Sequence, residues 1–201
     1  MALQATDTSQ QILSIARAIL AADGLGAVSF DAIARRLGRS KQAVLYWYPT
    51  KRDLLAAMFL PWLEAEARTA EEAVANVVAK PEAIAAFVRA IARFHLDDLD
   101  RFRMMYLAPQ TTGMRSTGRG ASVTGEEVYQ VTGRLYGALA RQLCGNDHSN
   151  GDAARKQAVA IHSAVLGLVL MFALSDALRD PLKHDAADLV EALIDSLTHN
   201  A

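Results

Sequence analysis

The chain has 201 residues, 52% of them hydrophobic and 21% charged, and its formal net charge is −1. Alanine is abundant, proline is rare and β-branched residues form no alternating runs, which favours a helical globular protein. A net charge so close to zero excludes a protein that binds nucleic acid over its whole surface. Residues 1–53 nevertheless hold seven Lys/Arg and four Asp/Glu, about +3, and the remainder holds fourteen and eighteen, about −4. A basic head on an acidic body suggests that only the head contacts an anion.

The sequence favours a cytoplasmic protein. Cys144 is the single cysteine, so no intrachain disulfide requires an oxidising compartment. The stretch "MALQATDTSQ" lacks the basic start and apolar run of a signal peptide. Residues 157–175 are apolar enough to suggest a membrane span, but the unbroken part, 164–174, is too short to cross a bilayer. We expect a helix that is buried in a core or an interface, and no membrane partner.

The basic head is predicted to hold short helices separated by tight turns. Apolar residues at helical spacing predict a first helix from Ser9 to about Asp23. Ser29 is a good N-cap for a second helix, which ends at Gly38, where glycine most easily adopts a left-handed backbone. Only Arg39 separates this glycine from Ser40, the N-cap of the next helix.

The third helix is predicted over Lys41–Trp47, and the Tyr48-Pro49 pair ends it. Thr50 then caps a fourth helix, with Asp53 three residues on in the manner of a capping box. Pro61 is expected to interrupt or kink that fourth helix.

The body is predicted to be helical as well. Further helices are expected over 82–99, 100–108, 126–144, 152–178 and 185–198. The stretch "PQTTGMRSTGRGASVTG", residues 109–125, is polar and rich in glycine and is predicted to be a mobile loop. The fold class is therefore all-α, with a head over 1–52 and a larger body over 53–201.

Two helices joined by a tight glycine turn form a helix-turn-helix, here over residues 29–47. In such a unit the second helix enters the major groove with its N-terminal end first. That places Lys41 and Gln42 near base edges, where Lys pairs with guanine and Gln with adenine. Ser29, at a helix start, and Lys51 are placed to hold phosphates.

The tyrosines of this segment have two interpretations. If the unit binds DNA, the hydroxyls of Tyr46 and Tyr48 are expected to donate to phosphates while their rings pack on the first helix. The alternative is an ordinary helical hairpin, in which Arg35 and Lys41 are merely solvated and Trp47 and Tyr48 belong to the core.

The segment "AIARRLGRSKQAVLYWYPTKRDLL", preceded by "VSF" and a helix, resembles the N-terminal domain of the tetracycline-repressor (TetR) family. That family has a helix started by Thr or Ser, a glycine, a short recognition helix with a late aromatic residue, and an aromatic-Pro/Gly-Ser/Thr-Lys exit. The residues that match are Ser29, Ala34, Gly38, Ser40, Tyr48, Pro49, Thr50, Lys51 and Leu54. The match covers about the first quarter of the chain, and the rest has only the general form of the family's helical body.

Two positions depart from the family's pattern. Arg39 stands where many members have Val, and an exposed Arg there could add a phosphate or base contact. Leu45 stands where many have Tyr, and the tyrosine comes one residue later, so that family contact is not carried over. Leu45 either touches a thymine methyl or simply packs. The predicted DNA-binding residues are Ser29, Arg39, Ser40, Lys41, Gln42, Leu45, Tyr46, Tyr48 and Lys51.

The resemblance implies a homodimer, because in this family the last two helices pair with their copies in a four-helix interface. The apolar helix over 158–174 and the stripe of Leu189, Leu193, Ile194 and Leu197 suit that role. Two-fold pairing doubles the DNA site that one short helix can read. The alternative is that both helices close the core of a monomer.

The resemblance also implies a pocket in the body for an unidentified small-molecule effector, and no cofactor. Such pockets are apolar cavities with a few polar groups. The predicted ligand-binding residues are Trp62, Phe87, Phe94, Met105, Tyr129, Tyr136 and His162. For each of them core packing is the alternative, and the tyrosines and the histidine are the ones whose polar ends most need a partner.

Motifs for catalysis do not occur in the sequence. No Glu is followed three residues later by His, as in di-iron bundles, and there is neither a Gly-x-Ser-x-Gly nor a P-loop. The stretch "HLDDLD", residues 95–100, invites a metal hypothesis, but its residues do not share one helix face, so a solvated acidic face is preferred. We therefore expect no catalytic and no metal-binding residue.

The sequence as a whole predicts a ligand-responsive transcription regulator, expected to be a repressor that binds a palindromic double-stranded DNA operator as a homodimer. The alternative is a helical small-molecule-binding protein or an enzyme whose head does not read DNA. To contact one DNA groove, three side chains must lie on a common face of the head: those of Arg39, Lys41 and Lys51. If they pointed away from such a face, the head could not bind DNA in this way.

Overall fold

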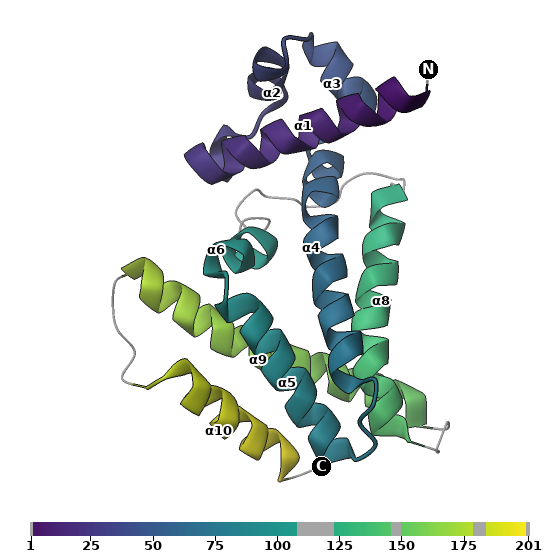
Figure 1. Cartoon of the computed structure of the whole chain (residues 1–201), viewed down its shortest axis with the longest axis vertical. Coiled ribbons are helices and arrows are strands. Elements are labelled where there is room, and N and C mark those ends of the chain that lie inside the picture. The colour runs from purple at the N-terminus through teal and green to yellow at the C-terminus, as the bar shows by residue number, and fades with distance from the viewer. Residues whose placement is uncertain (1, 108–122, 146–149, 179–183, 200–201) are drawn as a thin grey trace. The chain divides into compact units, whose positions relative to one another are not determined.

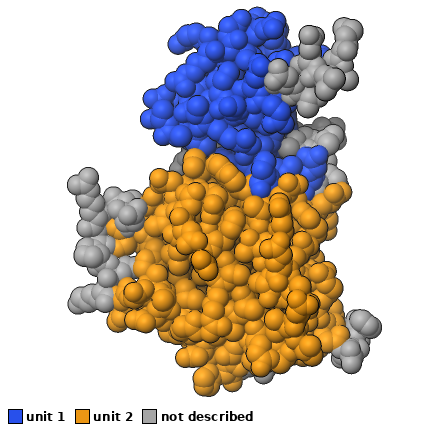
Figure 2. All heavy atoms as spheres, in the orientation of Figure 1, with its two compact units in different colours: residues 1–61, 112–128 blue, residues 62–111, 129–201 orange. Residues whose placement is uncertain are grey.

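The computed structural model describes residues 2–107, 123–145, 150–178 and 184–199. These ranges are helical and contain no strand, which confirms the all-α prediction. The chain forms two compact units, Met1–Pro61 with Thr112–Val128, and Trp62–Thr111 with Tyr129–Ala201 (Figure 2). The first unit reaches past residue 52, into the helix that follows the head, and the predicted boundary at 52 stays a prediction.

The head consists of three helices and a short turn: α1 (Ala2–Asp23), the 3-10 turn η1 (Leu25–Ala27), α2 (Phe30–Leu37) and α3 (Lys41–Trp47). In Figure 1, α1 runs past both α2 and α3. The apolar stripes predicted for the first two helices face one core, and α1 starts earlier than the predicted Ser9. The fully buried side chains of this core include Ile12, Ile19, Val28, Ile33 and Val44.

Local capping sets the turn between α2 and α3. The Ser29 Oγ accepts a hydrogen bond from the Ala32 amide at 3.2 Å, and the Ser40 Oγ accepts one from the Ala43 amide at 3.3 Å. Gly38 has φ 68° and ψ 30°, a left-handed conformation that glycine adopts without steric cost. The predicted helix-turn-helix is therefore present, with the caps and the glycine where the sequence placed them.

The next helix, α4 (Lys51–Val74), begins with the predicted capping box. The Asp53 amide donates to the Thr50 Oγ1 at 3.1 Å, and the Thr50 amide donates to the Asp53 Oδ2 at 3.2 Å. Pro61 was predicted to interrupt or kink the helix; the interruption is wrong, because α4 continues through this residue, and the kink stays a prediction. Helix α4 thus runs from the first unit into the second, which begins at Trp62.

The second unit is built from the following elements: α5 (Lys80–Leu96), α6 (Leu99–Phe102), a π-helical turn η2 (Arg103–Leu107), α8 (Val123–Cys144), α9 (Gly151–Leu178) and α10 (Ala186–Thr198). Helix α5 packs against α9 and α10, and α9 also contacts α6 and α10 (Figure 1). The predicted loop over 109–125 overlaps α8 at its last three residues, and the rest of it lies outside the described residues.

Helix α9 explains the apolar stretch near the C-terminus. Within the described residues, Gly151–Ser175 is long and apolar enough to cross a membrane by length and composition, and 33% of its most apolar window is buried. One face, which carries Ala158, Val165 and Val169, is fully buried against neighbouring helices. The apolar side chains of that face therefore pack in the core of the helical body.

Candidate functional site

The start of α3 presents a polar face in the head. Arg39, Ser40, Lys41 and Gln42 are all exposed and follow directly on the left-handed Gly38. A recognition helix needs such a row of donors at its N-terminal end, where it meets base edges. Lys51, at the start of α4, is exposed as well. Arg39, Lys41 and Lys51 are therefore all available at the surface.

Lys41 has a partner within the head. Its Nζ lies 2.9 Å from the Asp31 Oδ2, and both side chains are about half exposed or more. An exposed ion pair contributes only about 0–1 kcal/mol. A phosphate oxygen or a guanine could therefore replace Asp31 as the partner of Lys41 at small cost.

The two tyrosines of this segment have opposite environments. Tyr46 is 80% exposed and touches Trp47 edge-on, with ring centroids 5.4 Å apart, so the predicted packing of its ring on α1 is wrong. Tyr48 is buried as predicted, and its hydroxyl lies 2.8 Å from the Ser9 Oγ on α1. The hydrogen bond of Tyr48 therefore connects α1 to the end of α3. A hydrogen bond from the Tyr48 hydroxyl to a DNA phosphate would compete with the one to Ser9.

The remaining predicted DNA-binding residues are partly buried. Ser29 is half-buried and uses its Oγ as the cap of α2. Leu45 is half-buried too, which is compatible with both of its predicted roles. Of the predicted set, the side chains most open to a groove are thus those at the start of α3 together with Tyr46.

The body contains a buried polar cluster that sequence reasoning missed in part. Its centre is the fully buried Glu66 of α4. The Nε2 atoms of His95 (α5) and His162 (α9) each lie 2.9 Å from the Glu66 Oε1. The Tyr106 hydroxyl (η2) donates to the same carboxylate, 2.9 Å from Oε1 and 2.7 Å from Oε2. One carboxylate therefore ties together four helical elements of the second unit.

The hydrogen bonds keep this carboxylate ionised. Burial by itself would raise the pKa of Glu66, but the hydrogen bonds from His162 and His95, and the attraction of the two rings, lower it to about 2. Burial and the nearby Glu66 charge raise the pKa of Tyr106, so its phenol stays protonated and donates. Burial, followed by Glu66, also raises the pKa of the neighbouring Tyr136, whereas Arg155 lowers it.

The predicted ligand-binding residues divide into three groups. Phe87, Met105 and His162 are buried, Trp62, Phe94 and Tyr136 are half-buried, and Tyr129 is 68% exposed. The ring of His162 lies 5.5 Å from that of Tyr136 and 6.2 Å from that of Phe87, measured between centroids. The structure therefore brings these three together. Tyr129 lies on the surface of α8, which corrects the expectation that it faces an interior pocket.

The structure gives no sign of a metal centre in the part of the chain that it describes. No three His, Cys, Asp or Glu side chains are arranged there to hold an ion. Both histidines of the cluster direct Nε2 at one Glu66 oxygen. In "HLDDLD" the Asp97 and Asp100 carboxylates are exposed and pair with Arg93 and Arg103. The preferred interpretation of this stretch as an acidic face holds for the aspartates, but its histidine is buried.

A helix-turn-helix whose recognition helix begins with exposed polar residues, followed by an all-helical body, is an arrangement found in DNA-binding regulators. Residues 12–58 match the family model described as bacterial regulatory proteins, tetR family. No curated protein matches the chain significantly in sequence. The head is therefore similar to the N-terminal domain of the tetR family, as its sequence predicted.

Solved structures share this fold over nearly the whole length. The TetR family transcriptional regulator PfmR from Thermus thermophilus is 19% identical, with a TM-score of 0.61 over 93% of each chain. A tetR-family regulatory protein from Rhodococcus RHA1 is 18% identical, with a TM-score of 0.63 over 95% of each chain. FadR from Bacillus subtilis, in complex with stearoyl-CoA, is 14% identical, with a TM-score of 0.65 over 96% of this chain and 98% of FadR.

Proposed function

We propose that the chain is a cytoplasmic, ligand-responsive repressor that binds a palindromic operator as a homodimer. The observation that carries the proposal is the exposed row Arg39, Ser40, Lys41 and Gln42 at the start of α3. In the proposed complex Lys41 and Gln42 read base edges, Leu45 lies near a thymine methyl, and Arg39 and Lys51 contact phosphates.

The exposed face of α9 supports the homodimer. It carries Val159, Ser163, Gly167, Met171 and Leu174, at intervals of three or four residues along one side of the helix. Val159 is 37% exposed, Met171 56% and Leu174 46%. In a monomer this apolar stripe would face water, and the small residues in its middle allow a second helix to approach closely. A second copy of the chain is the partner that a two-fold operator requires.

The same face accounts for the membrane-like composition of α9. Its opposite face carries His162, whose ring is buried and bonded to Glu66. A lipid environment on all sides would leave that polar group without a partner. A partner helix on the exposed stripe and protein on the other face suit a cytoplasmic dimer.

The body supports a response to a small molecule. The fold neighbour FadR was solved with stearoyl-CoA. In this chain the half-buried Tyr136 adjoins the cluster that holds α4, the helix that begins directly after the head. A ligand that contacts this region differently in two states would shift the equilibrium between DNA-binding and released forms.

The test is selection of binding sequences from a random DNA library by the purified full chain. We expect a palindromic motif whose half-sites lie about one helical turn apart. Lys41→Ala and Gln42→Ala should each weaken binding to that motif about tenfold or more, since a good base contact discriminates by about 1–3 kcal/mol. Lys80→Ala, an exposed lysine of α5, is the matched control and should bind as the wild type does. No enriched motif, or unchanged binding by both α3 variants, would refute the proposal.

A further inference from the structure

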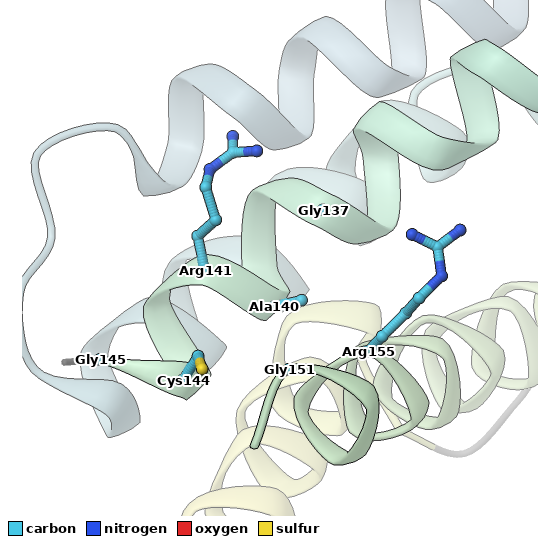
Figure 3. A pocket seen from close by; sticks show the side chains of 7 residues that line it. All are labelled: Gly137, Ala140, Arg141, Cys144, Gly145, Gly151 and Arg155. Atoms are coloured by element: carbon cyan, nitrogen blue, oxygen red, sulfur yellow. The ribbon is translucent and has the colours of Figure 1, made fainter. Parts of the chain in front are cut away.

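The second unit has a pocket of about 430 Å³ between the last turns of α8 and the first turns of α9 (Figure 3). Small residues create the hollow: Gly137, Ala140 and Cys144 on α8, and Gly151 on α9. The volume lies within the usual range of small-molecule sites, about 300–1,000 Å³. None of the residues predicted from the sequence lines this pocket.

Among the described residues, two arginines are the charged ones that line the pocket. The guanidinium of Arg141 lies along α8 over Gly137, since a Cβ placed on that glycine would be 3.5 Å from Nη1. The Arg155 Cζ lies 6.0 Å from the ring centroid of Tyr136, the residue before Gly137. Both cations therefore lie near residues 136–137 of α8, and Figure 3 shows Gly137 between the two side chains.

No carboxylate of the described residues balances these two charges. Among the described residues no acidic side chain lines the pocket, and neither arginine has an ion pair with any of them. The basic residues nearest to Arg141 and Arg155 in sequence, by contrast, do form ion pairs. Arg134 lies 4.0 Å from Glu71, and Lys156 lies 2.7 Å from Asp152. Two cations that line one hollow attract an anion, and charge-assisted hydrogen bonds to guanidinium are among the strongest that a surface site can offer.

The N-terminus of α9 also favours an anion in this pocket. Gly151 is the first residue of this 28-residue helix and lines the pocket. The first amides of a helix lack partners within it, and the helix dipole favours negative charge there.

We propose that this pocket binds an organic anion. A carboxylate or phosphate group is held by Arg141 and Arg155, and a short apolar part lies on Gly137, Ala140 and Cys144. The binding site stands independently of the proposed function. A role as the effector site rests on that function and has a structural basis, because Tyr136 touches both Arg155 and His162 of the buried cluster.

Cys144 provides a local reporter for the test. It is the only cysteine of the chain, it lines the pocket, and it is half-buried. The full-length protein is treated with the uncharged reagent iodoacetamide in the presence of octanoate, octyl phosphate or octylamine, at constant ionic strength. Calorimetry gives the affinity and stoichiometry of each probe, and mass spectrometry gives the rate of alkylation.

We expect at least one of the two anions to bind once per chain and to slow alkylation of Cys144 about tenfold, with octylamine having no effect. Arg141→Gln and Arg155→Gln should each weaken anion binding about tenfold, in line with the loss of a charge-assisted contact. Lys156→Gln is the matched control, because it removes the same charge one residue from Arg155, and it should bind as the wild type does. Both arginines are exposed, so their variants should fold, as circular dichroism will verify.

Three results would each overturn the site: no protection by either anion, equal protection by octylamine, or unchanged affinity in both arginine variants. The experiment contains no DNA, so it is separable from the proposed function. Protection of Cys144 by an anion in a protein that selects no DNA motif would keep the site and reject the regulator. The converse result would reject the site alone.

Discussion

Replacing Glu66 with Gln tests whether the body is held together by a buried anion. The substitution keeps the shape of the side chain and removes its charge. Glu66 is fully buried and accepts hydrogen bonds from His95, His162 and Tyr106. An amide can accept at its oxygen alone, so the variant resembles the protonated carboxyl group.

The structure gives the size and the sign of the effect. The pKa of Glu66 falls from its ordinary 4.5 to about 2 in the folded chain. With 1.36 kcal/mol for each pKa unit, ionisation contributes about 3 kcal/mol to the free energy of unfolding at pH 7. Because the folded pKa is the lower one, this contribution is complete above about pH 4.5 and is lost as the pH falls towards 2. Glu66→Gln lacks it at every pH.

The assay is urea unfolding of both proteins at pH 7, 5, 4 and 3.5, followed by far-UV circular dichroism at one protein concentration, since the stability of the proposed dimer would depend on that concentration. We expect a gap of about 3 kcal/mol at pH 7 that narrows by about 1.4 kcal/mol per pH unit below about 4.5. Glu64→Gln is the matched control, because Glu64 is exposed on the same helix, and it should change the free energy by less than about 0.5 kcal/mol. A gap that stays constant with pH, or that is absent at pH 7, would refute the account of the cluster.

Two further substitutions test the head and the proposed dimer. Gly38→Ala places a Cβ on a backbone with φ 68° and should lower the free energy of unfolding by about 1 kcal/mol, measured by thermal denaturation. An unchanged midpoint would show that the turn does not need its left-handed residue. Met171→Asp places a charge in the exposed stripe of α9 and should convert a dimer to a monomer in analytical ultracentrifugation. Persistence of the wild-type mass would locate the interface elsewhere.

The head could be predicted from sequence because its signals are local. The caps at Ser29 and Ser40, the left-handed Gly38 and the Thr50–Asp53 box each act within three or four residues, and each is present in the structure. The orientation of the tyrosines could not be predicted in the same way. Tyr48 lies just after the end of α3, in a non-helical conformation with φ −131° and ψ 87°, so the helical period that places Tyr46 does not apply to it.

The course of α4 shows tertiary packing outweighing a local rule. A proline inside a helix costs about 3 kcal/mol or more. Met58 and Phe59 before Pro61, and Glu66 and Ala67 after it, are nevertheless buried on this one helix. Burying a large apolar side chain contributes about 1.5–3 kcal/mol, so the packing on both sides offsets the proline.

The buried cluster was largely beyond sequence reasoning. Its hydrogen bonds join residues that are 29, 40 and 96 positions apart, and no local pattern links such residues. One signal was present in the sequence. Glu66 continues the helical stripe of Leu55, Phe59, Trp62 and Ala70, and a carboxylate on an apolar stripe needs a buried partner. His162 was predicted to need such a partner, and the structure shows that Glu66 is that partner.

The stability of the cluster sets the free energy that an effector would have to supply to separate Glu66 from its hydrogen-bond donors. Helix α4 runs without interruption from the end of the head to Glu66, so a movement of α4 that separates Glu66 from its donors forfeits the stabilisation of about 3 kcal/mol. That free energy corresponds to a bias of roughly a hundredfold towards the bonded arrangement. A single neutral hydrogen bond from a ligand, worth about 0.5–1.5 kcal/mol, cannot reverse it. Two charge-assisted bonds of about 1.5–3 kcal/mol each can, if they form in the released state alone. If the proposed anion bound Arg141 and Arg155 in the released state alone, its two charge-assisted bonds would be of the magnitude needed to offset this bias.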